Sequence, residues 1–286
     1  MTRLAAFGIV TLAAADLRRE PRHDSELLSQ LLLGETVRIG ASRDRGQWLR
    51  VRGEEDGYAG WMRAWSLVRV GAAAVARWRA RARWRVTAPI GALREVEGAG
   101  DPLMPVFLGS RLERLGGSPR RALIRLPGGR RAVLTGSALA PVARLSIGLR
   151  ERVRSLMGVP YLWGGRTPAG FDCSGFTQVT LDEQGISLPR DARLQFRATR
   201  PLGRLEPVRE GDLVFFGRVG EPVSHVGIML DRCSFVHCRG WVRMASLDPE
   251  NALCEKELLP QMRGVRRAGI DRRRARRTGV GRAKSA

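Results

Sequence analysis

The chain has 286 residues, an apolar content of 43% and a formal net charge of +22 that comes almost entirely from arginine. This length can hold two or three domains, and the apolar content is typical of a folded soluble protein rather than a disordered one. A basic chain can bind nucleic acid or an anionic surface, but an arginine-rich source composition is the favoured explanation of the charge. No segment reaches the ~18 apolar residues of a membrane span.

The N-terminus allows two interpretations. Residues 8–12 have the apolar character of a β-strand, which is the favoured interpretation. The alternative is a weak signal peptide over residues 1–15 that is cleaved near the alanines at 13–15.

Two small β-barrels are predicted to begin the chain. Short apolar runs broken by turns at Gly34-Glu35 and Asp56-Gly57 predict a first barrel over residues 1–70. A looser repeat of the pattern, with a hairpin turn at Pro127-Gly128-Gly129-Arg130, predicts a second, divergent barrel over residues 71–143. Residues 265–286 carry many arginines and no apolar periodicity, so a basic disordered tail is expected there.

Residues 144–264 have the pattern of an α+β domain, with helices packed on an antiparallel sheet. Helices are expected over residues 146–157 and 174–184, and Asp172 is a good N-cap for the second helix. A polar linker is expected over 189–195. Strands are expected over three further segments: residues 210–216, 224–230 and 234–238.

A nucleophile is predicted at Cys173, where the positive end of the second helix should lower the thiol pKa and raise the thiolate fraction. A structural alternative is a small buried cysteine. The chain has three histidines; His23 falls in the first barrel, whereas His225 and His237 fall on neighbouring expected strands. They supply a general base and a group that orients it, in the order of papain-like enzymes.

Metal binding is the competing interpretation of the same region. Its candidate ligands are Cys233, His237, Cys238 and Cys254. Zinc sites usually pair their ligands at C-x₂₋₄-C spacing, which is absent here, and strand alternation points Cys238 away from His237. No metal and no other cofactor is therefore predicted. The three cysteines other than Cys173 are expected to be reduced packing residues.

The ordered motifs of residues 145–245 resemble the NlpC-type cell-wall peptidase family. They are Tyr161-x-Trp163-Gly164-Gly165, Asp172-Cys173-Ser174-Gly175, Pro189-Arg190-Asp191 with Gln195, Gly211-Asp212-Leu213, Ser224-His225-Val226-Gly227-Ile228 and His237. The first seventy residues resemble a bacterial SH3-like domain, through Gly34-Glu35-x-Val37, Trp48-Leu49-x-Val51 and Asp56-Gly57-Tyr58-x-Gly60-Trp61. Together they resemble γ-D-glutamyl-L-diamino acid endopeptidases, in which the cysteine attacks a γ-D-glutamyl amide of a peptidoglycan stem peptide and forms a thioester.

This resemblance also implies a substrate pocket. The side chains of Tyr161, Asp172, Ser174 and Asp191 would bind D-glutamate and the ammonium of a free N-terminal L-alanine, and carboxylates suit an ammonium. Tyr58 and Glu26 of the first barrel would close the pocket. Taken singly, Asp172 can be only a helix cap and Asp191 only a turn former.

Other functions are kept open. One is an amidase or acyltransferase of the same fold. Another is a non-enzymatic wall-binding or nucleic-acid-binding module, although the aromatic residues expected of a single-strand binder are absent from the basic tail. The expected partner is a stem peptide and not nucleic acid. Reduced cysteines and a recycling role indicate the cytoplasm, whereas a functional signal peptide would place the protein outside the membrane.

Overall fold

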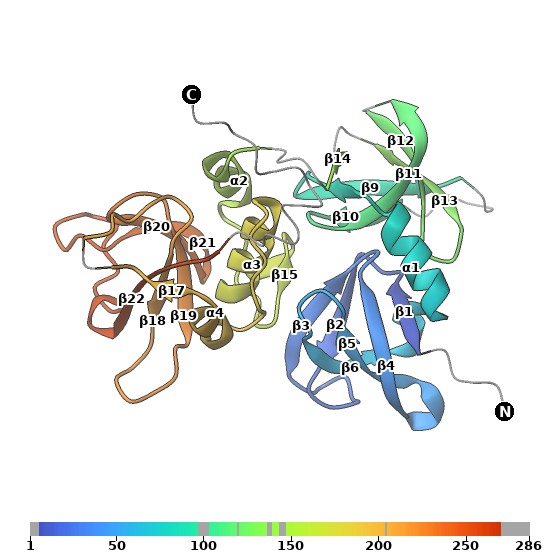
Figure 1. The fold of residues 1–286 in the computed structure, drawn as a ribbon, viewed down its shortest axis with the longest axis horizontal. Coiled ribbons are helices and arrows are strands. Elements are labelled where there is room, and N and C mark those ends of the chain that lie inside the picture. Colours follow the sequence, from blue (N-terminus) through green and yellow to red (C-terminus); the bar gives the residue numbers. More distant parts are fainter. Residues whose placement is uncertain are drawn as a thin grey trace. The chain divides into compact units, whose positions relative to one another are not determined.

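A computed structural model describes residues 6–96, 103–118, 120–135, 139–142, 147–203 and 205–269. The chain divides into two compact units, Met1–Arg144 and Leu145–Ala286. Most of their elements are labelled in Figure 1. No helix among these residues combines the length and the apolar character needed to span a bilayer.

The first unit begins with an antiparallel seven-stranded sheet in the order β3-β2-β6-β5-β4-β1-β7. Its strands are β1 (Phe7–Val10), β2 (Ala14–Arg18), β3 (Leu27–Leu32), β4 (Thr36–Arg43), β5 (Trp48–Gly53), β6 (Ala59–Arg63) and β7 (Leu67–Val70). Alternate residues such as Leu17, Val37 and Met62 point into one core and are almost fully buried. The strand predicted near the N-terminus is confirmed as β1, which pairs with both β4 and β7.

The second sheet repeats the topology of the first. Its strands are β8 (Trp84–Val86), β9 (Ile90–Glu95), β10 (Leu103–Phe107), β11 (Arg111–Ser118), β12 (Arg121–Arg125), β13 (Arg131–Thr135) and β14 (Leu139–Pro141). Their order is β10-β9-β13-β12-β11-β8-β14, which is the order of the first sheet with every number raised by seven. The repeat supports the prediction of a second barrel of the same kind, although β9 and β10 were not expected from the sequence.

A helix that the sequence did not reveal, α1 (Ala72–Arg81), connects the two sheets (Figure 1). Val75 and Trp78 are its buried residues, and they pack with Ile9 of β1. The indole Nε1 of Trp78 donates to the backbone oxygen of Gly34 at 2.8 Å. Gly34 has a φ of +86°, and a Cβ there would lie 2.0 Å from the Arg111 oxygen, so this turn requires glycine.

The second unit contains an antiparallel sheet in the order β17-β22-β18-β19-β20-β21. Its strands are β17 (Arg200–Pro201), β18 (Leu213–Phe216), β19 (His225–Met229), β20 (Ser234–Arg239), β21 (Trp241–Ser246) and β22 (Met262–Arg267). The helices are α2 (Leu149–Leu156), α3 (Cys173–Glu183) and α4 (Ala192–Ala198), and a short hairpin, β15 (Arg166–Thr167) and β16 (Gly170–Phe171), precedes α3. Contacts of α3 with β19 and β20 make this the predicted α+β arrangement.

Helix α3 is the centre of the second unit. Its N-cap is Asp172, as predicted, and the helix begins at Cys173, one residue before the predicted start. Nearly every residue of α3 is buried, including Phe176 and Thr180. A buried ion pair between Arg152 of α2 and Glu183 of α3, with both side chains 2% exposed, ties the two helices together.

Two predictions for this unit are wrong. The expected polar linker contains helix α4, because the carbonyl of Asp191 accepts from the backbone N–H groups of Leu194 and Gln195 and so starts a helical turn. Residues 265–267 belong to β22, not to a disordered tail. Arg267 reaches both carboxylate oxygens of Asp212 at 2.7 Å, which gives the strand a charged anchor that apolar periodicity could not reveal. Residues 270–286 lie outside the described residues.

Candidate active site

Cys173 lies against the beginning of strand β19. The cysteine is 7% exposed, and its Sγ lies 3.9 Å from the backbone oxygen of Ser224, the residue before β19. The thiolate form would also accept hydrogen bonds from the backbone N–H groups of Val226 and Ser174. Packing of α3 on the sheet therefore brings the thiol to the strand that carries His225.

The two histidines predicted to act together are in direct contact. Nε2 of His225 lies 2.9 Å from Nδ1 of His237, and the ring planes meet at 77°. The adjacent strands β19 and β20 position them. Gly227 makes room, because a Cβ there would lie 2.7 Å from the Phe235 ring and 3.3 Å from the His237 Cβ. With Nε2 engaged, the remaining ring nitrogen of His225, Nδ1, is the one left to accept a thiol proton.

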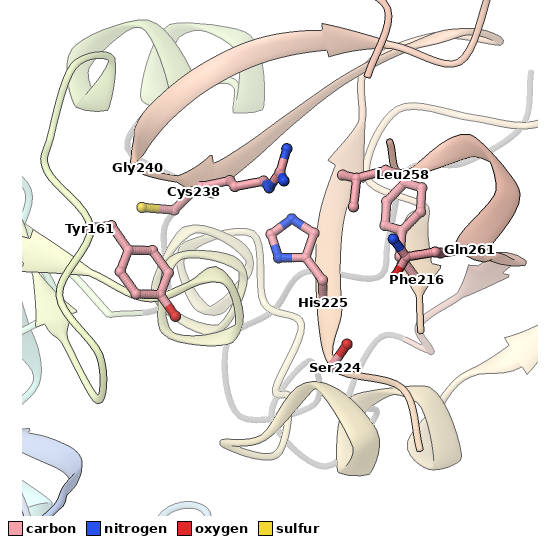
Figure 2. Close-up of a pocket in the computed structure, with 9 residues that line it drawn as sticks. Tyr161, Phe216, Ser224, His225, Cys238, Gly240, Leu258 and Gln261 are labelled. Atoms are coloured by element: carbon pink, nitrogen blue, oxygen red, sulfur yellow. The ribbon is translucent and has the colours of Figure 1, made fainter. Parts of the chain in front are cut away.

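The His225 ring faces a cavity of about 390 Å³ in the second unit, and Figure 2 shows the labelled side chains around it. Nine residues line the cavity: Tyr161, Phe216, Ser224, His225, Cys238, Arg239, Gly240, Leu258 and Gln261. The lining combines apolar walls with a few polar groups, which is typical of a ligand site. A substrate in this cavity would therefore meet the imidazole.

The protonation states differ from the sequence-based expectation. Burial, followed by the nearby Asp172, raises the pKa of Cys173 to about 12. Removal of the sulfur from water opposes the partial positive charge of the helix end, which favours the thiolate. Burial, followed by Arg239 and Arg243, lowers the pKa of His225 to about 4. Burial thus disfavours the charged forms of both the thiol and the imidazole.

Asp172 does more than cap α3. Its Oδ1 accepts from the backbone N–H of Gly175 at 2.7 Å, and its Oδ2 accepts from that of Gly164 at 3.0 Å. The buried guanidinium of Arg190 donates to both oxygens, at 2.9 and 2.5 Å. Ser174 Oγ donates to Asp172 and accepts from Arg190. These donors fill the roughly four acceptor positions of a carboxylate, so Asp172 organises the loop and the helix start.

The remaining substrate-pocket candidates of this unit differ in exposure. Tyr161 borders the cavity, and burial followed by the charges of Cys173 and Asp172 raises the pKa of its hydroxyl. Asp191 follows Arg190 at the start of α4, and its side chain is 25% exposed, with Arg193 at 3.6 Å. Among these carboxylates, Asp191 is the one more open to a substrate amine.

Tyr58 and Glu26 belong to the first unit. Glu26 forms an ion pair with Arg19 at 2.5 Å, and Tyr58 packs against the core of the first barrel. Their predicted role in closing the pocket stays a prediction.

Two residues next to the site were not predicted as functional. Arg190 stands inside the Pro-Arg-Asp motif, and its position beside Asp191 was the available signal. No sequence motif pointed to Glu255, because it belongs to a distant segment and comes close to His237 only when the chain folds. Cys238, expected to be a packing residue, donates to the Phe171 oxygen at 3.2 Å. Within the described ranges no group of three or more His, Cys, Asp or Glu residues is placed to hold a metal ion.

Comparison with known families agrees with this geometry. The profile of the NlpC/P60 family matches residues 158–260. These residues form an NlpC/P60 domain. A profile described as the bacterial dipeptidyl-peptidase SH3 domain matches residues 17–67, which contain β2 to β6.

The chain is similar to several named proteins. The γ-D-glutamyl-L-lysine dipeptidyl-peptidase of Bacillus subtilis is 27% identical over 236 residues, 75% of this chain and 73% of that protein. The muramidase/DL-endopeptidase CwlT of Bacillus subtilis is 49% identical over 74 residues, 25% of this chain. The chain spans about a fifth of the length of the first curated relatives it matches. A crystal structure of an NlpC/P60 family protein from Bacillus cereus has the same fold, with 22% identity, a TM-score of 0.77 and coverage of 91% of this chain and 99% of that one.

Proposed function

We propose that the protein is a cysteine endopeptidase that hydrolyses the γ-D-glutamyl bond to the L-diamino acid of peptidoglycan stem peptides. The observation that carries the proposal is the His225–His237 contact of 2.9 Å at a cavity beside the strand that Cys173 contacts. The relative named a γ-D-glutamyl-L-lysine dipeptidyl-peptidase supports the substrate class.

The proposed reaction begins from neutral partners. Nδ1 of His225 accepts the Cys173 proton while Sγ attacks the γ-carbonyl carbon. The resulting imidazolium gives this proton to the amine of the leaving diamino acid, the C–N bond breaks, and a γ-glutamyl thioester remains. Water then attacks the thioester while His225 takes its proton, and that proton returns to the departing sulfur. The backbone N–H of Cys173, at the start of α3, would stabilise the oxyanions.

Substrate selection is proposed to rest on a free N-terminal L-alanine. Asp172 is already saturated by Arg190 and backbone donors, so its contribution would be to shape the pocket. The more exposed Asp191 is the better carboxylate for the alanine ammonium, with Tyr161 bordering the cavity. Ser174 completes the part of the proposed pocket that lies in this unit.

The test uses L-Ala-γ-D-Glu-diaminopimelate and its L-lysine counterpart, each with a free and with an acetylated alanine. Cleavage at the γ-glutamyl bond, read by mass spectrometry, is expected for the free forms. The variant Cys173→Ala should lose hydrolysis. The matched variant Cys233→Ala, which changes a partly exposed cysteine far along the sequence, should keep it. Full activity of Cys173→Ala would refute the nucleophile, and transfer to another amine instead of water would indicate an acyltransferase.

Action on released peptides in the cytoplasm is part of the proposal. Sequencing the N-terminus of the mature protein from cells tests it, because cleavage near residue 15 would place the protein outside.

A further inference from the structure

The buried side of the His237 ring lies near the carboxylate of Glu255, a residue outside the sequence motifs of the site. Nε2 of His237 is fully buried and has no hydrogen-bond partner within the described residues. The Oε1 atom of Glu255 lies 3.6 Å from it. This distance exceeds a hydrogen bond, but the low exposure of both side chains, 0% and 8%, leaves the interaction little screened by water.

Glu255 is held in this place from several sides. Its backbone N–H donates to the Ser246 oxygen at the end of β21, at 3.3 Å. Its carboxylate pairs with Arg239 at 2.9 Å and with Arg243 at 2.5 Å. Arg243 lies directly opposite His237 in the pairing of β20 with β21. The carboxylate is therefore shared by two arginines and lies beside the histidine.

We propose that Glu255 is a positioning residue that selects the catalytically competent tautomer of the histidine pair. With Nε2–H on His237 facing the carboxylate, Nδ1 of His237 accepts from Nε2–H of His225. Nδ1 of His225 then carries the lone pair that the Cys173 proton needs. The opposite tautomer would turn the Nε2 lone pair of His237 toward a carboxylate oxygen, which is repulsive, and would place a hydrogen on Nδ1 of His225, which then cannot act as a base.

Removing the negative charge reverses this preference. In Glu255→Gln the new amide NH2 and the guanidinium of Arg243, now without its carboxylate, are the donors available to Nε2 of His237. A donor at that nitrogen stabilises the Nδ1–H tautomer of His237 and, through the 2.9 Å contact, the Nδ1–H tautomer of His225. The inference rests on the proposed function for its effect on rate, but the tautomers themselves can be observed without any substrate.

The experiment uses the full chain with ¹⁵N-labelled histidine. Three histidines give three ring systems, and His23→Gln identifies the one in the first barrel. We expect Nε2–H on His225 and His237 in the unaltered protein and a shift toward Nδ1–H in Glu255→Gln. The value of kcat on the stem peptide should fall roughly 10- to 100-fold, less than the 10²–10⁴ attributed to a whole general base.

The matched control is Glu257→Gln, because Glu257 also pairs with Arg239, at 2.6 Å, but is exposed. It should leave tautomers and kcat unchanged. Arg243→Gln breaks the same ion pair while keeping Glu255, and it should keep the Nε2–H form. If Glu255→Gln behaves like Glu257→Gln, or if Arg243→Gln alone causes the tautomer shift, the inference is overturned.

A second variant distinguishes an effect on the tautomers from a loss of folding. If Glu255→Gln fails to fold, Glu255→Asp retains the charge at greater distance and should show a partial tautomer shift; an unshifted, fully active Glu255→Asp protein would count against the inference. Absence of peptidase activity in the unaltered protein would refute the proposed function and leave the tautomer measurement to decide the role of Glu255.

Discussion

Replacement of Arg190 by methionine tests whether the Asp172 network holds the start of α3. The Arg190 side chain is 1% exposed and contacts both oxygens of Asp172, whose side chain is 11% exposed. Removing one partner of a buried pair costs about 3–5 kcal/mol, because it leaves a charge without its counterion. Arg190→Met should therefore lower the opening free energy of α3 by that amount.

Hydrogen exchange read by mass spectrometry is the appropriate assay, since it separates α3 from the strands of the first unit. A loss of about 3–5 kcal/mol corresponds to roughly 150- to 5,000-fold faster exchange of α3 amides. Peptides from β1 to β14 should exchange as before. Peptidase activity should fall in parallel, because Asp172 places the Cys173 end of α3 through Gly175.

Two further variants sharpen this test. Arg193→Met changes a neighbouring arginine that is 61% exposed and should have little effect. Asp172→Asn combined with Arg190→Met removes both charges and keeps an N-cap, so it should recover most of the loss. Equal exchange in Arg190→Met and Arg193→Met, or strictly additive effects in the double variant, would refute the reasoning.

Two other predictions concern the histidines and the last strand. Burial and the nearby arginines lower the pKa of His225 to about 4, and burial followed by the charge of His225 and the arginines lowers that of His237 to about 2. Both rings should therefore stay neutral as the pH falls below 6.5, where the histidines of an unfolded chain become protonated. The acidic limb of the pH profile of kcat/KM should therefore lie near pH 4, and Arg243→Gln should move it to higher pH. The free energy of unfolding should decrease as the pH falls from 6.5 toward 4. An acidic limb near pH 6.5 would contradict this prediction. Ending the chain at Gln261 removes β22 together with the Arg267–Asp212 pair, so the second unit should unfold, whereas ending the chain at Gly269 should leave it folded. Thermal melting followed by circular dichroism measures this, and equal melting of the two truncated proteins would show that β22 is dispensable.

Local signals in the sequence predicted the start of the site well. Asp172 is a residue type that caps helix N-termini, so it predicted the start of a helix from the local sequence alone. Helix α3 begins one residue before the predicted position. The segments predicted as strands over residues 224–230 and 234–238 contain β19 and most of β20. In contrast, α1 has two buried residues among several arginines, so its apolar face was too narrow to recognise.

The sequence by itself determined the two barrels, the start of α3 and the residue types of the Cys173, His225 and His237 set, because each depends on short-range patterns. Tertiary structure alone decided protonation and partners. Burial beside Asp172 opposes the thiolate that the helix dipole favours, Arg190 saturates the carboxylate expected to bind substrate, and Glu255 reaches His237 from a distant segment. Desolvation and charge proximity depend on three-dimensional packing, and no local pattern in the chain encodes them.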